Sequence, residues 1–452
     1  MRELSQLRLL INLAIPAILS QVGHTLVGLA DTIMIGKTGN VTALAASALA
    51  NNILSVPIVF LVGISYAVTP KIAEYFAQGN HTSCMAILKQ SLINNILWTI
   101  LICTILFISL PYSYLLGLEV GVIDLALPFF GYLIASLPGL VIFQSFKQFY
   151  DGLGNTKPGM VASLLANLLN VVLNWLLIYG KCGFPELGLI GAGISNLISR
   201  WVMGLALFSY FMLEPNSKRW RQSFRFYRFD KEVFFLLNRL GIPISFQFLF
   251  EVGAFSFTAI LVGKMGEISL AAHQIVITLA SITYMMASGL ASAATIRIGH
   301  FVGLKDKKMI LLTSRNAMVL VVLFMGFTAS LFLFFKQEIP SLFIEKEEVG
   351  LAAGSLLLIA ALFQISDGVQ VVFLGCLRGL SDVKIPTLIT FIAYWVLAIP
   401  LGFYLGVTIK LGLNGTWWGL FAGLSISAIF MLIRFYYLAN KITFEKSILK
   451  IK

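Results

Sequence analysis

The two halves of this sequence repeat each other at an offset of 227 residues. Residues 152–155, Gly-Leu-Gly-Asn, return as residues 379–382, Gly-Leu-Ser-Asp, and Pro16 returns as Pro243. An offset of half the chain length that holds at separate places indicates two homologous halves in head-to-tail order. Any fold of this chain must therefore accommodate one architecture twice.

The composition places both halves in a membrane. The chain has 452 residues, of which 58% are hydrophobic and only 12% are charged, and its mean hydropathy is +0.91. A soluble fold of this length could not cover its surface with so few charges. We therefore predict an all-α integral membrane protein with twelve transmembrane helices, six in each of two homologous lobes. The predicted spans are 10–35, 45–69, 91–114, 125–148, 159–180, 190–213, 240–263, 269–296, 311–335, 350–375, 387–409 and 415–439.

The repeat and the spans together predict the domain organisation. We expect an N-lobe at 1–213, a cytoplasmic linker at 214–239 and a C-lobe at 240–452. Two like halves in a bilayer favour substrate binding between them and alternating access by rocking. The first apolar run is too long for a signal peptide and contains Asp31, so we interpret it as the first helix.

The net charge of +12 has an uneven distribution along the chain. With both termini inside, 25 Lys and Arg lie in the tails, in the inner connections or at the inner ends of the spans, and six lie in the outer loops. This asymmetry predicts cytoplasmic termini in a bacterial inner membrane. The richest stretch, from Lys218 to Lys231, joins the halves, and we interpret it as a linker on anionic lipid rather than a nucleic-acid site.

Three carboxylates lie within predicted spans, namely Asp31, Glu251 and Asp367. A charge inside a bilayer costs at least ~2.5–3.5 kcal/mol on insertion scales, so each needs a partner, a bound cation or a proton. The alternative is a carboxylate that polar neighbours hold for packing alone. The charge of Arg200 also lies in a span, where it pairs with a carboxylate or extends to the interface, and His24 lies on the helical face of Asp31.

In the first half, amide side chains accompany Asp31. Asn170 and Asn174 share one face of the fifth span, and Asn174 and Asn196 lie at a depth similar to that of Asp31. One carboxylate with several amide oxygens suits Na⁺ or a proton. Amides also join membrane helices to one another, so the asparagines alone leave ligation and packing open.

In the second half, Gln247 precedes Glu251 by one turn, and Asp367 lies in another span. The repeat offset carries Asp31 to Thr258, so the halves share a fold but differ in chemistry. Two carboxylates suit a cation or a cationic drug, and Phe255 offers a ring for stacking and cation–π contact.

Several other site types are excluded. Gly36-Lys37-Thr38 lacks the first glycine of a phosphate-binding loop, and no stretch is long enough for a soluble nucleotide-binding domain. The four histidines are scattered, and the four cysteines have no paired spacing, which predicts free thiols. We expect no cofactor and no enzyme activity, and work driven by an ion gradient.

Several motifs resemble the multidrug and toxic compound extrusion (MATE) transporters. Pro16 followed fifteen residues later by Asp31 is similar to their first helix, and Asn170-Val-Val-Leu-Asn174-Trp is similar to their fifth. Residues 148–155 and 377–382 resemble their paired loop signatures. The likeness covers nearly the whole chain.

The resemblance implies a central cleft between the lobes and export of organic cations in exchange for H⁺ or Na⁺. By carry-over, Asp31, Asn170, Asn174 and Asn196 form the N-lobe cation site, Pro16 is a hinge, and Glu251 and Asp367 are the C-lobe carboxylates of the NorM branch.

Two positions qualify the resemblance. The DinF-like branch has an aspartate in place of Asn174, which favours the NorM branch, and Phe363 replaces an expected tyrosine beside the C-lobe carboxylates. We expect a monomer that contacts membrane lipids and binds small organic cations. The rival interpretations are a lipid flippase of the same superfamily, which would favour a cationic cleft, and a polytopic membrane enzyme, which would need a catalytic constellation.

Overall fold

A computed structural model describes residues 2–116, 119–214, 220, 229–344 and 346–442. Those residues form helices and connections, with no strand among them. Twelve helices of the described chain are long and apolar enough to cross a membrane, and each coincides with a predicted span. The prediction of an all-α membrane protein with twelve spans is therefore confirmed.

The chain divides into two compact units. Unit 2 comprises residues 19–245 and unit 1 comprises residues 1–18 and 246–452. Both boundaries fall inside a helix, within α1 (Arg2–Gly36) and within α9 (Lys231–Gly263). Each boundary follows an interior proline by two residues, Pro16 in α1 and Pro243 in α9. The compact units thus differ from the predicted sequence lobes by one half-helix at each boundary.

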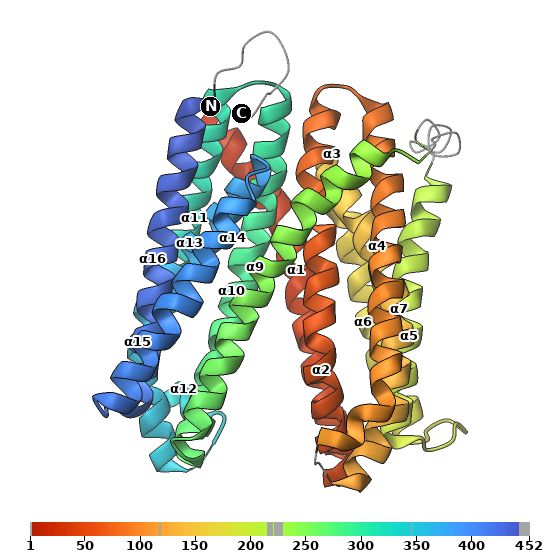
Figure 1. Cartoon of the computed structure of the whole chain (residues 1–452), viewed down its shortest axis with the longest axis vertical. Coiled ribbons are helices and arrows are strands. Elements are labelled where there is room, and N and C mark those ends of the chain that lie inside the picture. Colours follow the sequence, from red (N-terminus) through yellow and green to blue (C-terminus); the bar gives the residue numbers. More distant parts are fainter. Residues whose placement is uncertain (1, 117–118, 215–219, 221–228, 345, 443–452) are drawn as a thin grey trace. The chain divides into compact units, whose positions relative to one another are not determined.

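Unit 2 is a helical bundle whose strongest packing joins α5 to α7, α6 to α7 and α2 to α5. In addition to residues 19–36 of α1 and residues 231–245 of α9, this unit contains α2 (Val41–Ser65), α3 (Val68–Ala77), α4 (His81–Ser109), η1 (Leu110–Leu116), α5 (Val120–Gly152), α6 (Lys157–Ile178) and α7 (Gly188–Leu213) (Figure 1).

Unit 1 is a second bundle, in which α13 packs against α10, α11 and α16. Beside the ends of α1 and α9, its elements are α10 (Glu267–Gly303), α11 (Lys307–Phe334), α12 (Glu338–Ser341), α13 (Glu347–Gly379), α14 (Lys384–Phe391), η3 (Ile392–Ala398), α15 (Ile399–Phe403), η4 (Tyr404–Thr408) and α16 (Gly412–Lys441). Leu10 and Ala14 of α1 share a core with Phe435 and Ala439 of α16, so the first helix and the last helix of the described chain contribute to one core.

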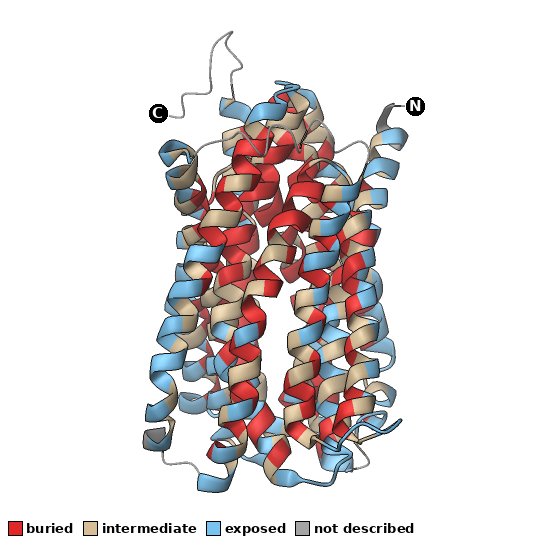
Figure 2. Ribbon diagram, turned by 90° about the vertical axis from the view of Figure 1, so that its right-hand side faces the viewer, coloured by how far each residue is buried: buried red, intermediate tan, exposed pale blue. Residues whose placement is uncertain are grey.

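The helices of the bundles have buried residues along one side and exposed apolar residues along another. Figure 2 shows buried residues running along the helices, with exposed residues on their other sides. The exposed set includes large apolar side chains such as Leu165, Leu168 and Phe327, each 62% exposed. Exposed apolar faces of this length suit contact with lipid rather than water.

Small residues let the helices of unit 2 approach closely. A Cβ on Gly63 would lie 2.5 Å from the Cα of Ser245, and a Cβ on Gly139 would lie 2.8 Å from the backbone of Arg200. Such positions tolerate only glycine, and small residues are a common basis of helix packing in membranes.

Two predicted features need correction. α9 begins at Lys231, so residues 231–239 of the predicted linker are helical. The eleventh predicted span, 387–409, is not a uniform α-helix, because η3 and η4 within it are π-helical. The basic residues Lys218, Arg219, Arg221, Arg225 and Arg228 lie outside the described residues.

Candidate functional site

The second half of α1 is fixed against α6 along its length. Ser20 donates a hydrogen bond to Ser163 at 3.1 Å, and Tyr179 donates to the carbonyl of Met34 at 2.8 Å. Between these contacts, a Cβ on Gly23 would lie 2.8 Å from the Nδ2 of Asn167. This contact line positions Asp31, which lies one turn before Met34, toward the polar face of α6.

The carboxylate of Asp31 is the acceptor of a chain of amide hydrogen bonds. Asn174 donates to its Oδ1 at 2.5 Å, and Asn196 of α7 donates to its Oδ2 at 2.9 Å. The same amide group of Asn174 donates to the Oδ1 of Asn170 at 3.2 Å. The structure therefore brings together all four residues of the predicted N-lobe site, from α1, α6 and α7.

The amide network still has buried atoms without a partner in the described part of the chain. These are the Oδ1 of Asn174 and the Nδ2 of Asn170, and both residues are at most 2% exposed. A buried polar group without a hydrogen bond marks a place for an ion or a water molecule. An amide oxygen beside a carboxylate is a donor set that fits a hard cation such as Na⁺.

Arg200 lies near this network but makes its hydrogen bond elsewhere. Its Nη1 donates to the Oγ of Ser136 at 2.9 Å, and its charge interacts electrostatically with Asp31. His24 packs edge-on against Phe143, with ring centroids 6.2 Å apart, and its ring interacts with the charges of Lys147 and Arg200. Arg200 thus belongs to the surroundings of Asp31, whereas in the described chain the hydrogen bonds of Asp31 come from asparagines.

A second polar region lies inside unit 1. Glu251 and Asp367 are 4% and 3% exposed, and they are close enough to interact electrostatically. Gln247, one turn before Glu251 on α9, is 1% exposed. The structure therefore buries all three predicted C-lobe residues in this unit.

This second region also has unsatisfied polar atoms among the described residues. The Oε1 of Glu251 has no hydrogen-bond partner there, and neither amide atom of Gln364 has one, although Gln364 is fully buried. Gln364 precedes Asp367 by three residues on α13, so both side chains occupy one face of that helix. Buried groups of this kind are normally satisfied, so these atoms can bond to a ligand or to an ordered water molecule.

Tyr394 supplies a buried hydroxyl that the sequence analysis missed. It lies on the π-helical η3, is fully buried, and exchanges hydrogen bonds with Gln370 at 3.0 and 3.2 Å. It also interacts electrostatically with Glu251 and Asp367. A tyrosine therefore does accompany these carboxylates, although Phe363 occupies the position at which one was expected.

Two buried cations were also missed. Arg378 of α13 is 9% exposed and Lys147 of α5 is 8% exposed, although the sequence analysis counted both with the inner side of the membrane. Lys147 forms an ion pair with Asp151 at 2.7 Å, one turn later on α5. Arg378 donates to Gln247 at 3.2 Å and interacts electrostatically with Glu251. The i, i+4 spacing of Lys147 and Asp151 could have predicted their ion pair. No local pattern predicted the contact between Arg378 and Gln247.

Phe255 belongs to an aromatic group beside these residues. Its ring centroid lies 6.3 Å from that of Phe363 and 6.0 Å from that of Tyr394. Phe255 follows Glu251 by one turn of α9, so its ring and the carboxylate occupy one face of the helix. An aromatic surface next to buried carboxylates suits a lipophilic cation.

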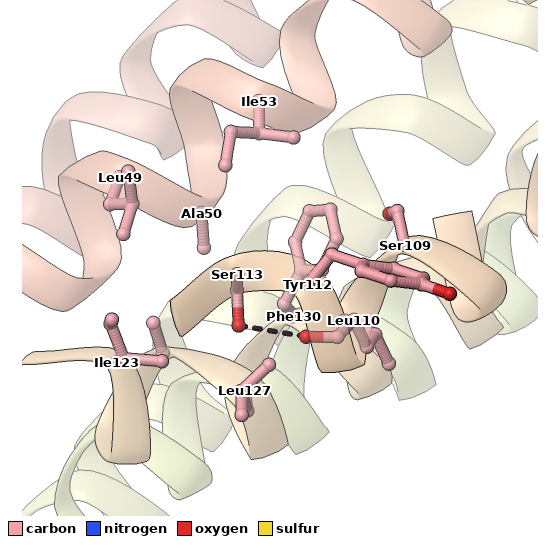
Figure 3. Close-up of a pocket in the computed structure, with 11 residues that line it drawn as sticks. Leu49, Ala50, Ile53, Ser109, Leu110, Tyr112, Ser113, Ile123, Leu127 and Phe130 are labelled. Carbon is pink, nitrogen blue, oxygen red and sulfur yellow. Dashed lines mark hydrogen bonds between the residues drawn. The ribbon is translucent and has the colours of Figure 1, made fainter. Parts of the chain in front are cut away.

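An apolar pocket of about 290 Å³ lies in unit 2, apart from the residues above. α2, η1 and α5 form it, and Figure 3 shows apolar side chains such as Leu49, Ile53 and Phe130 around it. The hydroxyl of Ser113 donates a hydrogen bond to the carbonyl of Leu110 at 2.7 Å. None of the predicted site residues lines this pocket.

Comparison with known proteins gives full-length matches. A family model described as MatE matches residues 16–176 and 243–404, two segments that begin at the offset of the internal repeat. The multidrug resistance protein NorM of Photobacterium profundum is 31% identical over 94% of this chain and 94% of that protein. The multidrug resistance protein NorM of Vibrio cholerae is 33% identical over 96% of this chain and 95% of that protein.

Solved structures share the fold at lower identity. A variant of the Vibrio cholerae MATE transporter VcmN has a TM-score of 0.88 and 18% identity, with 98% of both chains covered. A eukaryotic MATE transporter has a TM-score of 0.85 and 20% identity, with 97% of this chain and 98% of that chain covered. At such identities the likeness concerns the arrangement of helices alone.

Proposed function

The chain belongs to the MatE family, and from this premise we propose that it is a multidrug efflux transporter that exports organic cations in exchange for an inward coupling cation. Its relatives are multidrug resistance proteins, and the twelve candidate spans among the described residues fit a transporter. The observation that carries the proposal is the Asp31 carboxylate, which lies inside a span and accepts hydrogen bonds from two amides.

The Asp31 network is the proposed site of the coupling cation. Its amide donors make an ionised carboxylate tolerable in apolar surroundings, because hydrogen bonds replace part of its lost hydration. A bound Na⁺ would be held by Asp31 and the Oδ1 of Asn174, and would supply one positive charge there. A proton on the same carboxylate supplies that charge without further ligands, and burial favours the protonated form of a carboxyl group. We therefore favour H⁺ as a competent driver.

Coupling requires that neutralisation of Asp31 changes the protein. Loss of the charge weakens the charge-assisted hydrogen bonds from Asn174 and Asn196 that fix α1 to α6 and α7. The backbone of α1 is already weakened at Pro16, which cannot donate a helical hydrogen bond. A rearrangement of α1 that begins there would disfavour the bound drug and release it outward.

The drug is proposed to bind at the Glu251 and Asp367 carboxylates. These groups are buried in unit 1, beside the aromatic rings of Phe255 and Tyr394. Opposite charge holds the cationic centre, and the rings contact the apolar body of the drug. Because the drug and the coupling cation are proposed to bind to different residues, one chain can bind both.

The proposal includes a cellular setting. The excess of Lys and Arg in the predicted inner connections supports cytoplasmic termini in the inner membrane of a bacterium. Exposed apolar faces on both bundles support lipid around the protein. Each unit has many internal contacts and buried apolar residues of its own, which supports a functional monomer.

Transport in proteoliposomes tests the proposed function. Purified protein is reconstituted into vesicles loaded with a fluorescent organic cation such as ethidium, and H⁺ and Na⁺ gradients are imposed together. We expect drug movement against the direction of the cation gradients, and its loss when the gradients are collapsed by ionophores. Gradient-independent leakage equal to that of protein-free vesicles would refute the function.

A further inference from the structure

Basic side chains gather where α16 ends in unit 1. Lys441, the last residue of α16, donates a hydrogen bond to the hydroxyl of Tyr437 at 2.5 Å, and its Nζ lies 4.5 Å from the centroid of the same ring. The guanidinium of Arg434 lies 5.9 Å from that centroid. Residues 434, 437 and 441 are three and four positions apart, so they share one face of the helix. Two cations therefore accompany one tyrosine ring in the last turns of α16.

A third cation reaches this end of the unit from α11. Lys307, the first residue of α11, donates from its Nζ to the carbonyl of Asn440 at 2.7 Å. This carbonyl belongs to the last turn of α16, where the backbone of the helix offers no further donor. Because Asn440 directly precedes Lys441, the two lysines come from different helices to one place.

The cluster has an excess of positive charge. Asp382 accepts a hydrogen bond from the Nε of Arg434 at 2.8 Å, and the side chain of Asp306 is engaged as the N-cap of α11. Lys305 and Lys308, which lie beside Asp306 in the sequence, are both exposed. With the two lysines described above, five cations accompany two carboxyl groups. Positive charge therefore predominates even when both carboxyl groups are ionised.

An exposed apolar stripe of α16 leads to this cluster. Ile429, Phe430 and Ile433 are each more than half exposed, and they precede Tyr437 by one or two turns of the helix. Tyr437 itself is 49% exposed. An apolar face that ends at a tyrosine and basic side chains is typical of a helix that leaves the hydrocarbon region of a membrane. The stripe and the cluster therefore match the two parts of a lipid, its acyl chains and its headgroup.

The repeated half of the chain forms without these cations. Phe211 of α7 corresponds to Phe435 of α16, because both are fully buried and each packs against a phenylalanine, and those two partners are related by the offset of 227. The residue before it is the neutral Tyr210 in α7 and Arg434 in α16. α7 ends two residues after its phenylalanine, at Leu213, whereas α16 continues for six. The extra turn and its charges are therefore not a requirement of the shared architecture.

We propose that the end of α16 binds an anionic phospholipid, with Lys307, Arg434 and Lys441 around its phosphate and the exposed stripe of α16 against an acyl chain. A phosphate oxygen accepts strong hydrogen bonds from ammonium and guanidinium groups, and each cation near an anionic lipid adds to the attraction. A lipid is favoured over a free phosphate because it also covers the apolar stripe. The charge asymmetry of the sequence assigns this end of the unit to the cytoplasmic leaflet.

Binding of defined lipids to the purified full-length protein tests the proposal. Protein in a neutral detergent is titrated with phosphatidylglycerol or phosphatidylcholine, which carry the same acyl chains but differ in net charge. Bound lipid is counted by native mass spectrometry at one ionic strength. The variants are Lys441→Gln and the double variant Lys307→Gln with Lys441→Gln. Lys157→Gln is the matched control, because Lys157 is an exposed cation at the start of α6 in unit 2.

We expect the wild type and Lys157→Gln to bind phosphatidylglycerol more tightly than phosphatidylcholine. Lys441→Gln should weaken the binding of phosphatidylglycerol by about fivefold, and the double variant should weaken it further by a similar factor. Equal affinity of the wild type for the two lipids would overturn the proposal, and so would an equal loss in Lys157→Gln and Lys441→Gln.

Two further measurements complete the test. If Lys307→Gln prevents folding by releasing the carbonyl of Asn440, Lys441→Gln alone decides, because Lys441 is exposed at the end of its helix. Soluble glycerol phosphate is added as a competitor at the concentration of the lipid. We expect it to leave phosphatidylglycerol bound, and displacement at that concentration would show recognition of phosphate without lipid and overturn the assignment.

Discussion

At the scale of single residues, the two polar regions solve the problem of a buried carboxylate differently. Asp31 accepts its hydrogen bonds from neutral amides, and the charge of Arg200 interacts with it without a hydrogen bond among the described residues. Glu251 lies near one cation and one further carboxylate, so its charge depends on what else is bound. The first arrangement suits reversible binding of a small coupling cation, and the second suits a larger organic cation.

Asp31→Asn should abolish efflux while the protein remains folded. The side chain keeps its shape, but it loses its charge and one of its two acceptor oxygens, which costs about 1 kcal/mol of stability. Drug efflux and thermal unfolding are measured together. Asp124→Asn is the control, since Asp124 accepts only an exposed hydrogen bond from Tyr114. Wild-type efflux in well-expressed Asp31→Asn would refute the role of Asp31 as the switch, and Asn174→Ala should weaken the same step.

Glu251→Gln and Asp367→Asn should weaken transport of cationic drugs more than they alter proton coupling. Each change removes a buried carboxyl group beside Phe255 and Tyr394 but leaves the Asp31 network intact. Drug-induced proton release and drug affinity are measured in the same preparation. A large change in proton release with unchanged drug affinity would contradict this assignment. It would indicate that the region of Glu251 and Asp367 binds the coupling cation.

Residue types at helical spacing predicted the Asp31 network because its asparagines repeat on one helical face. The position of Tyr394 could not be predicted in this way. Its π-helical turn changes the direction of the side chain relative to a regular helix. Arg378 was missed because its partner Gln247 is 131 residues away, on another helix. Pairing between distant helices leaves no local pattern.

At the scale of elements, hydropathy predicted the existence of all twelve spans but not their ends. The predicted span 269–296 is part of α10, which continues to Gly303. The extra turns contain polar residues such as Arg297 and His300, which end an apolar run without ending a helix. Helix ends depend on capping and packing contacts, whereas the apolar length depends on the membrane.

The close contact between α13 and α10 leads to a prediction about the stability of the protein. Gly375 has no space for a Cβ because the backbone of Ala291 lies against it, whereas Gly350 on the same helix has no neighbour within 4 Å. Gly375→Ala should therefore destabilise the protein by about 1–3 kcal/mol through overpacking. Gly350→Ala should be neutral or slightly stabilising, since alanine favours helix. Thermal unfolding of both variants is measured in the same detergent. Equal melting temperatures would contradict the close contact of Gly375 with Ala291.

At the scale of the whole molecule, charge asymmetry predicts which ends face the cytoplasm. Cysteines placed at positions 218–231 should resist a membrane-impermeant thiol reagent in intact cells. Native Cys182, which is exposed in the predicted outer loop after α6, is an internal positive control and should be labelled. Cys84 and Cys376 are buried and give little background. Labelling at 218–231 from outside, with Cys182 protected, would reverse the orientation.

The coupling ion is a property of the whole molecule, and the two candidates are H⁺ and Na⁺. The Asp31 network offers one charge and one uncommitted amide oxygen, a small ligand set for Na⁺ but a sufficient one for a proton. We therefore expect drug movement under a pure pH gradient in Na⁺-free buffer. Asn174→Ala removes the uncommitted oxygen, so it should impair Na⁺-driven transport more than H⁺-driven transport if both occur. Full transport under a Na⁺ gradient, with none under a pH gradient alone, would reject the preference for H⁺ and assign the network to Na⁺.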